Sequence, residues 1–275
     1  MQPALGTAWA IKLPLLEWCE VPAGTVTVEG KVYRVAPFLM SKYPVTDAQF
    51  QPFIEALDGF YSDACWSGLP PEVRPTEPGV QRWPLPDHPR EHVSWYDALA
   101  FCRWLSRRTG LPIRLPTEQE WQRAAQGDDG RVFPWGNYYD DTSRCNTRET
   151  GLARTTPVGQ FPKGVGAYGV HDLAGNVWEW CLNEYENPSR IAVGGTKARV
   201  LRGGSWFSIH DAAQNTVRYF ALPHTRDFDV GFRLVCSAVQ YRGVVRPALA
   251  LTLISTAKST LRTLRRGVSE LSKRM

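Results

Sequence analysis

The residues best suited to bind soft metals, cysteine and histidine, are scattered along this chain of 275 residues. The six cysteines stand singly, without a CxxC pair or a zinc-type Cys/His spacing, so zinc and haem-attachment sites are excluded. Buried free thiols are expected, with a disulfide as the alternative. Among the five histidines, His88 and His92 are four residues apart, but Pro89 between them argues against one helical face.

Carboxylates that could perform paired acid–base chemistry occur in one stretch rich in Gly, Asn and Trp. These are Asp172, Glu179 and Glu184, and a structural role is the favoured interpretation for them. The string RGGSW (202–206) does not have the GxSxG pattern of a nucleophile elbow, and no Ser-His-Asp or Cys-His spacing is present. The sequence therefore predicts no hydrolytic site.

A hairpin and three helices are predicted to position these residues. Residues 21–40 have the β-branched alternation of two strands around Glu29-Gly30. Capping residues Thr46, Ser94 and Thr117 each precede an apolar periodic segment, which predicts helices that begin at the following residue. The first of these helices should bury one face, made of Phe50, Phe53, Ile54 and Leu57.

The stretch 127–199 shows no clear period and is predicted to be irregular, with tryptophans attaching its loops to the core. Composition is ordinary for a globular protein, at 43% hydrophobic and 21% charged residues. The N-terminus lacks the pattern of a signal peptide, and no run of 18 apolar residues occurs. A cytoplasmic protein is therefore expected by default.

The positive net charge of +5 comes from the C-terminal tail. From Tyr241 to Met275 the chain holds eight Lys or Arg residues and one acid, Glu270. Apolar residues repeat there at spacings of three and four, which predicts a basic amphipathic helix within 238–275. Self-association or an acidic partner bound through 247–275 is expected, an anionic membrane surface is an alternative, and no specific nucleic acid is predicted. The apolar repeat is Ile254, Ala257, Leu261, Leu264, Val268 and Leu271.

Ten strings in order resemble the formylglycine-generating-enzyme, or sulfatase-modifying-factor, family. The resemblance implies an α+β, C-type-lectin-like fold over residues 17–237, after a lead-in of 1–16. That fold has a small twisted antiparallel sheet, two main helices and extensive loops. The strings are PAGTVTV, KYPVTDAQFQPF, HVSWYDALAFCRWLS, RLPTEQEWQRAA, FPWGN, NTRETG, TTPVGQFP, YGVHDLAGNVWEWC, RVLRGGSW and GFRLV.

The family's oxidases bind copper through a cysteine pair located between RGGS and GFR. No cysteine lies between Cys181 and Cys236, so the ligands for Cu(I) are missing. A second branch resembles ergothioneine-forming synthases, which hold iron through a histidine-rich helical domain, but no HxxxH pairing on one helical face with a following carboxylate occurs in this sequence. Neither copper nor iron is expected, and the chain is expected not to be an enzyme.

The resemblance also implies a possible calcium site in DLAGNVWEW. The side chains of Asp172 and Glu179, with backbone carbonyls near Gly175 and Val177, would supply the oxygen ligands that calcium prefers. In the alternative arrangement Asp172 caps a turn and Glu179 forms a salt bridge without a metal.

The chain is most similar to a non-enzymatic branch, the variable proteins of diversity-generating retroelements. Those proteins keep a fixed frame such as RGGSW and GFR around positions varied through asparagine codons. Candidate varied, ligand-binding positions are therefore assigned within 207–229, and none is a Lys, Glu, Gln, Met or Trp, the types that such codon changes cannot encode. They are Phe207, Ser208, Ile209, His210, Asp211, Tyr219, Phe220, Ala221, Leu222, His224, Asp227, Phe228 and Asp229.

Six of these candidates are large and apolar, and exposed residues of this kind commonly mark a binding surface. Packing of the same six side chains into the sheet is the alternative. The leading interpretation is a non-catalytic protein that displays a diversified surface to an unknown protein or cell-surface ligand. The alternatives are a metal-dependent oxidoreductase with an atypical site and an interaction module acting through its basic tail.

Overall fold

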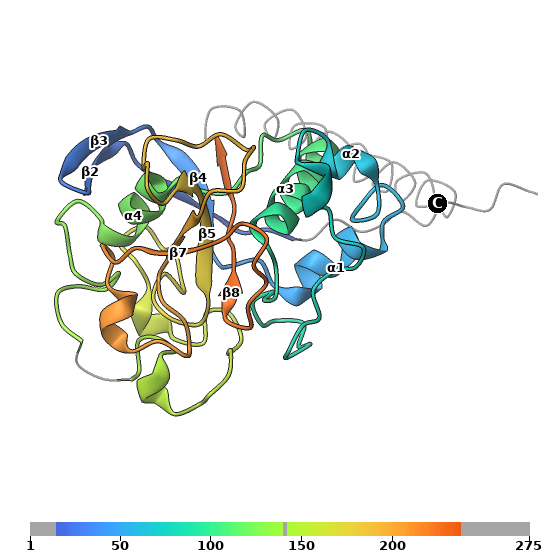
Figure 1. Cartoon of the computed structure of the whole chain (residues 1–275). Coiled ribbons are helices and arrows are strands. Elements are labelled where there is room, and N and C mark those ends of the chain that lie inside the picture. Colours follow the sequence, from blue (N-terminus) through green and yellow to red (C-terminus); the bar gives the residue numbers. More distant parts are fainter. Residues whose placement is uncertain (1–14, 140–141, 238–275) are drawn as a thin grey trace, which may run out of the picture.

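The computed structural model describes residues 15–139 and 142–237, so the tail and most of the lead-in lie outside the described residues. Within the described residues, nine strands and four α-helices alternate with long loops and four short 3₁₀ helices (Figure 1). The strands are β1 (Trp18–Val21), β2 (Gly24–Val28), β3 (Lys31–Val35), β4 (Phe38–Ser41), β5 (Trp178–Glu184), β6 (Arg199–Arg202), β7 (Tyr219–Ala221), β8 (Val230–Gly231) and β9 (Val235–Ser237). The helices are α1 (Asp47–Glu55), α2 (Asp63–Trp66), α3 (Trp95–Thr109) and α4 (Glu118–Gln126), with η1 (Pro71–Val73), η2 (Arg148–Thr150), η3 (Pro162–Gly164) and η4 (His210–Ala213).

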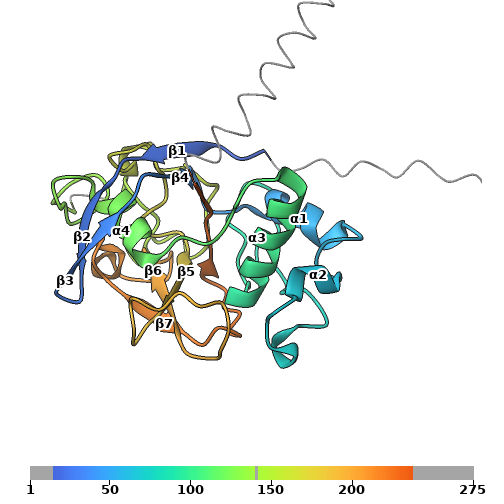
Figure 2. The ribbon, with the colours of Figure 1, turned by 90° about the horizontal axis from the view of Figure 1, so that it is seen from above.

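The strands form three small sheets, with the orders β1-β4-β9, β2-β3 and β7-β6-β5-β8. All strand pairs are antiparallel, as expected, except β5 and β8, which run parallel. The expected α+β class is confirmed, with α3 and α4 as main helices and loops between the short strands. In Figure 2, α1, α2 and α3 lie together on one side, and the β2–β3 hairpin lies on the other.

The three predicted helix starts are confirmed by their caps. Thr46, Ser94 and Thr117 each accept a hydrogen bond from the third residue of the helix and form a capping box. Gly110 ends α3 in the left-handed conformation that glycine adopts without strain. Leu57 was wrongly placed on the buried face, because α1 ends at Glu55 and the side chain is fully exposed.

The predicted turn between the two strands of the β2–β3 hairpin is also confirmed. Glu29 and Gly30 have positive φ angles of 48° and 71° between β2 and β3. Two such residues in succession produce the twist that a tight hairpin requires. The hairpin lies against α4, because Gln122 donates to the Thr27 carbonyl at 3.0 Å.

The strand β5 was missed, because its region was expected to be irregular. All seven of its residues are buried, since the strand lies inside the four-stranded sheet. A strand covered on both faces lacks the alternation of apolar and polar residues that identifies a strand in a sequence. Two indoles attach it to α3 and to the residue before the N-cap of α3. Trp95 donates to the Cys181 carbonyl and Trp180 donates to the Val93 carbonyl, each at 2.9 Å.

All six cysteines are free thiols, and five of them are buried, so the expected reduced state is confirmed and the disulfide alternative is not. No helix in residues 15–139 and 142–237 is both long and apolar enough to cross a membrane.

Candidate ligand-binding groove

A groove of about 590 Å³ lies over one face of the β7-β6-β5-β8 sheet. Trp178, Leu201 and Val230 contribute to its lining from β5, β6 and β8. The displayed segment, residues 207–229, supplies most of the remaining walls from three separate stretches: the turn after β6, the strand β7, and the loop before β8. The candidate residues that line it are Phe207, Ser208, Ile209, Tyr219, Ala221, Asp227, Phe228 and Asp229.

Two glycines precede the displayed segment. Gly203 and Gly204 have φ angles of 94° and 71°, so the chain turns sharply as it leaves β6. A Cβ at Gly203 would lie 3.0 Å from the Trp121 ring and 3.2 Å from the Leu173 carbonyl oxygen. Only glycine combines this backbone angle with such close packing. The GG of RGGSW is therefore a structural requirement of the frame.

A buried ion pair closes the frame at its other end. The guanidinium of Arg233 donates to both carboxylate oxygens of Glu179, at 2.6 and 2.7 Å, and both side chains are almost fully buried. Arg233 also donates to the carbonyl oxygens of Ser41, His171 and Asp172. The GFR motif is thus joined to β5 and to the loop before it by charge-assisted hydrogen bonds.

The apolar candidates between these ends are displayed, and the alternative of inward packing is wrong for them. Tyr219 is 54% exposed, and four others are exposed to a similar degree. Phe228 is half-buried, because its ring packs against Trp206 and Phe207 with centroids 5.6 Å away. The other exposed members are Phe207, Ile209, Phe220 and Leu222.

The displayed residues do not form one continuous surface. Tyr219 stacks on Trp178 inside the groove, with ring centroids 5.3 Å apart. Phe220 instead packs against Tyr185 at 4.7 Å and does not line the groove, since neighbouring residues of a strand point to opposite faces. Leu222 and His224 are exposed but also lie outside the groove lining.

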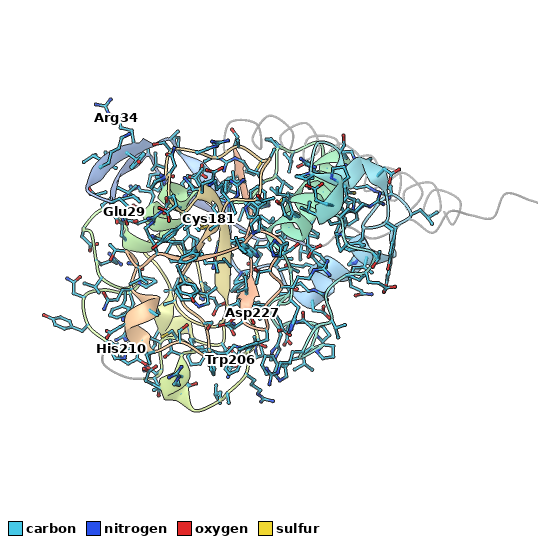
Figure 3. All side chains as sticks on the ribbon, in the orientation of Figure 1. Glu29, Arg34, Cys181, Trp206, His210 and Asp227 are labelled. Atoms are coloured by element: carbon cyan, nitrogen blue, oxygen red, sulfur yellow. The ribbon has the colours of Figure 1, made fainter. Side chains whose placement is uncertain are left out.

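His210 and Asp211 lie beside the groove lining in a small polar cluster. The ring of His210 stacks on Tyr139 with centroids 4.2 Å apart, and its two nitrogens lie 3.2 Å from Glu149 and 3.3 Å from Asp211. Burial raises the pKa of Glu149, but hydrogen bonds from Thr147 and His210 outweigh it and lower the pKa to about 2. Glu149 therefore remains ionised and fixes the start of η4. Figure 3 shows Trp206, His210 and Asp227 together in the lower half of the molecule.

Asp229 was expected on the displayed surface, but its side chain is mostly buried. It is 8% exposed, and its Oδ2 accepts a hydrogen bond from Ser205 at 2.7 Å. One oxygen of this carboxylate therefore supports the RGGSW frame, while the residue still lines the groove. Ser208 likewise contacts Ser205, with 3.1 Å between the hydroxyl oxygens.

Arg148 is a groove residue that the sequence analysis missed. It donates through Nε and Nη2 to the Phe207 carbonyl oxygen, and its guanidinium lies 5.0 Å from the Phe207 ring centroid. The residue lies within NTRETG, some sixty positions before the displayed segment. No local pattern indicates that these two stretches meet.

The residues expected to hold calcium have other partners. Both oxygens of Glu179 accept from Arg233, and Oε2 also accepts from the Trp121 indole at 2.8 Å. Asp172 accepts from the Gly159 N–H through Oδ2, and the Gly175 carbonyl accepts from the Val177 N–H.

Both carboxylate oxygens of Glu179 are engaged by these donors, so Glu179 does not fit as the calcium ligand that the resemblance implied. The observed arrangement is the salt bridge. Across residues 15–139 and 142–237, no group of three or more His, Cys, Asp or Glu side chains is placed to hold a metal ion.

Comparisons with known proteins support this architecture. The chain is 34% identical over 263 residues to "Inactive C-alpha-formylglycine-generating enzyme 2" of Mus musculus, covering 80% of this chain and 79% of that protein. It is 35% identical over 271 residues to "Formylglycine-generating enzyme" of Thermomonospora curvata, covering 76% and 85%. The solved "Treponema denticola variable protein 1" shares the fold, with a TM-score of 0.62, 23% identity, and coverage of 80% and 94%.

These relatives carry names of both active and inactive proteins, so membership alone does not decide whether this chain catalyses a reaction. Residues 16–238 match the sequence profile of the sulfatase-modifying factor enzyme 1-like domain. The match spans the sheets, the helices and the groove described above. The chain belongs to the sulfatase-modifying factor enzyme 1-like family.

Proposed function

We propose that this chain is a non-catalytic ligand-binding protein that recognises its partner through the displayed segment 207–229. The observation that carries the proposal is the set of exposed aromatic and aliphatic side chains held between two rigidly packed ends. Exposed apolar groups of this size cost solvation free energy unless a partner covers them. Aromatic rings also give large contact areas with few rotatable bonds, as in other recognition surfaces.

The thiols of the chain support a non-catalytic role. Cys181 is the last cysteine before the displayed segment, and Cys236 is the first after it. Burial raises the pKa of the Cys181 thiol well above its usual value, so the thiolate that a copper ion needs is disfavoured. No cysteine lines the groove. The oxidase chemistry of the family therefore lacks its soft ligands in this part of the chain.

The proposal includes diversification of the segment by a retroelement. The contrast between packed ends and exposed intermediate positions supports it, because exposed positions can change at a smaller cost to the fold than buried ones. An adenine-rich near-copy of the DNA encoding residues 199–235, beside a reverse transcriptase gene, is the expected genomic finding. A neighbourhood without such a copy would reject diversification and leave the binding role to be tested separately.

A peptide selection tests the binding role directly. A phage-displayed random peptide library would be selected on the immobilised chain, and enriched peptides would then be measured against variants. Binding should be lost in the double variant Phe207→Ser/Tyr219→Ser, whose side chains line the groove. The control Phe220→Ser removes an equally exposed ring from the opposite face and should leave binding unchanged. Equal binding to all three proteins would overturn the assignment of the surface.

An activity assay tests the non-catalytic part. The purified chain would be supplied with Cu(I) and oxygen and incubated with a cysteine-containing peptide, and the products would be measured by mass spectrometry. We expect no conversion of cysteine to formylglycine beyond the protein-free control. Turnover that depends on the chain and copper would establish the oxidoreductase alternative instead.

A further inference from the structure

One end of the groove carries negative charge without a cationic partner. Asp227 and Asp229 both line the groove, and within the described residues no Lys, Arg or His nitrogen lies within 4 Å of either carboxylate. Asp227 accepts only the Phe228 N–H through Oδ1. Asp229 accepts from Ser205 through Oδ2, and among residues 15–139 and 142–237 no other side chain is recorded as donating to it.

The nearby cations are directed to other groups. Arg226, one residue before Asp227, donates through two nitrogens to Asp97, at 2.7 and 2.8 Å. Arg148 donates to the Phe207 carbonyl at another wall of the groove. Arg82 lies over the rings of Trp83 and Phe228, at 4.9 and 5.3 Å from their centroids, and does not line the groove.

Burial of Asp229 adds a physical reason to expect an external cation. Burial raises the pKa of its carboxyl, a hydrogen bond from Ser205 opposes this change, and the charge of Asp227 adds to the rise. A mostly buried carboxylate without a cation nearby is costly to keep ionised. A positive group brought into the groove would stabilise its charged form.

The aromatic walls favour the same kind of ligand. Trp178, Phe207, Tyr219 and Phe228 all line the groove. The faces of such rings attract ammonium and guanidinium groups, with energies that increase where water is excluded. Carboxylates and aromatic faces in one groove are therefore complementary to a cation on an apolar stem.

We propose that this groove binds a lysine or arginine side chain from an extended segment of a partner protein, with the cation at Asp227 and Asp229. This inference rests on the proposed function and specifies the partner's chemistry. A groove of about 590 Å³ has the size of a site for a short peptide segment, not only for one side chain.

Three capped tripeptides that differ in one side chain test the inference. The probes are Ac-Leu-Arg-Leu-NH₂, the same peptide with citrulline, which is a neutral analogue of arginine, and the same peptide with glutamate. Binding to the full chain would be measured by NMR titration. The arginine peptide should bind about three- to tenfold more tightly than the citrulline peptide, and the glutamate peptide should bind most weakly.

Single substitutions show which carboxylates cause the preference for arginine over citrulline. Asp227→Asn keeps an acceptor for the Phe228 N–H and should reduce the arginine-to-citrulline ratio to about one. Asp229→Asn, which keeps an acceptor for Ser205, should reduce it as well. The control Asp211→Asn removes an exposed charge outside the groove lining and should leave the ratio unchanged. Thermal unfolding of each variant would establish that the fold is intact.

The outcomes separate this inference from the proposed function. If the arginine and citrulline peptides bind equally well, and Phe207→Ser abolishes the binding of both, the cation preference is overturned. The assignment of the recognition surface would then remain in place. Butylguanidinium that binds as tightly as the arginine peptide would overturn the protein-partner assignment in favour of a small cation. Absence of binding by all three peptides would overturn the inference, while the peptide selection would still judge the proposed function.

Discussion

The two ends of residues 202–233 and the stretch between them differ in how they are held. At the ends, the side chains of Arg202 and Arg233 are fully buried, and their hydrogen bonds reach residues far away in the sequence. Between the ends, the side chains of Phe207, Ile209 and Tyr219 are about half exposed, and the rings of Phe207 and Tyr219 each contact two neighbouring rings. The ends therefore carry stability, and the intermediate positions carry contact surface.

This separation explains how one fold can present different surfaces. A residue without buried partners can be replaced at little cost in unfolding free energy, whereas a buried charge cannot lose its partner without a large penalty. Substitutions at the ends should therefore unfold the chain, and substitutions in the middle should change recognition alone. The following experiments test this difference, from the largest expected effect to the smallest.

Arg233→Ala should have the largest effect. It leaves the buried Glu179 carboxylate without its bidentate partner, and such losses cost about 3–5 kcal/mol of unfolding free energy. Chemical denaturation would measure the loss. The control is Arg226→Ala, which removes an equally bidentate but partly exposed arginine from Asp97 and should cost less. If the Arg233→Ala protein were as stable as the parent, the frame would not depend on the Arg233–Glu179 ion pair.

Gly203→Ala should rank second. The substitution adds a Cβ at a φ of 94° and places it 3.0 Å from the Trp121 ring, so backbone strain and crowding combine to about 2–3 kcal/mol. Gly68→Ala is the matched control, because its φ is also positive, at 75°, but its Cβ would meet nothing within 4 Å. In thermal unfolding, Gly203→Ala should lower the melting temperature more than Gly68→Ala does. An equal decrease in the two variants would show that crowding against Trp121 does not contribute.

Glu149→Gln should have a moderate effect that depends on pH. Because the folded-state pKa of Glu149 is lowered from 4.5 to about 2, its contribution is present above about pH 4.5 and is lost as the pH falls toward 2. At pH 7 we expect a loss of about 1 kcal/mol, reduced by the partial exposure of the group. Denaturation at several pH values should show the parent and variant converging in acid. A gap that stays constant would contradict the role of the charge.

Serine substitutions of displayed residues should have small effects on stability. Phe207→Ser and Ile209→Ser each remove a half-exposed side chain, so each should lower the unfolding free energy by about 1 kcal/mol or less. The same variants should lose the peptides enriched on the parent chain. Large destabilisation would show that the displayed segment belongs to the structural core after all.

Calcium should have the smallest effect. Because the oxygens of Glu179 are used by Arg233 and Trp121, neither added calcium nor a chelator should shift the melting temperature. Differential scanning calorimetry in calcium and in EDTA would measure this. A clear rise in melting temperature with calcium would show that these side chains rearrange to bind the ion.

Local features of the fold could be predicted from the sequence because their causes are local. The capping boxes at Thr46, Ser94 and Thr117 and the turn at Glu29-Gly30 involve residues within a few positions of each other. The strand β5 could not be identified in this way, because burial on both faces removed its alternating pattern.

The candidate site was predicted in part. The segment that supplies most of its residues was identified from the sequence, but the arrangement of those residues around the groove was not. Tyr219 and Phe220 were grouped, although they lie on opposite faces of β7. Arg148 was missed because it reaches the groove from a distant loop. Asp229 was placed on the surface, although the fold turns it toward Ser205.

By itself, the sequence determined where helices begin, where the hairpin turns, and that no cysteine lies between Cys181 and Cys236. Only the tertiary structure decided which displayed side chains share a groove and which carboxylates there lack a cation. The physical reason is that capping and turn formation depend on neighbours along the chain. Burial, pairing of charges and the walls of a groove depend on segments brought together from far apart by the packing of the core.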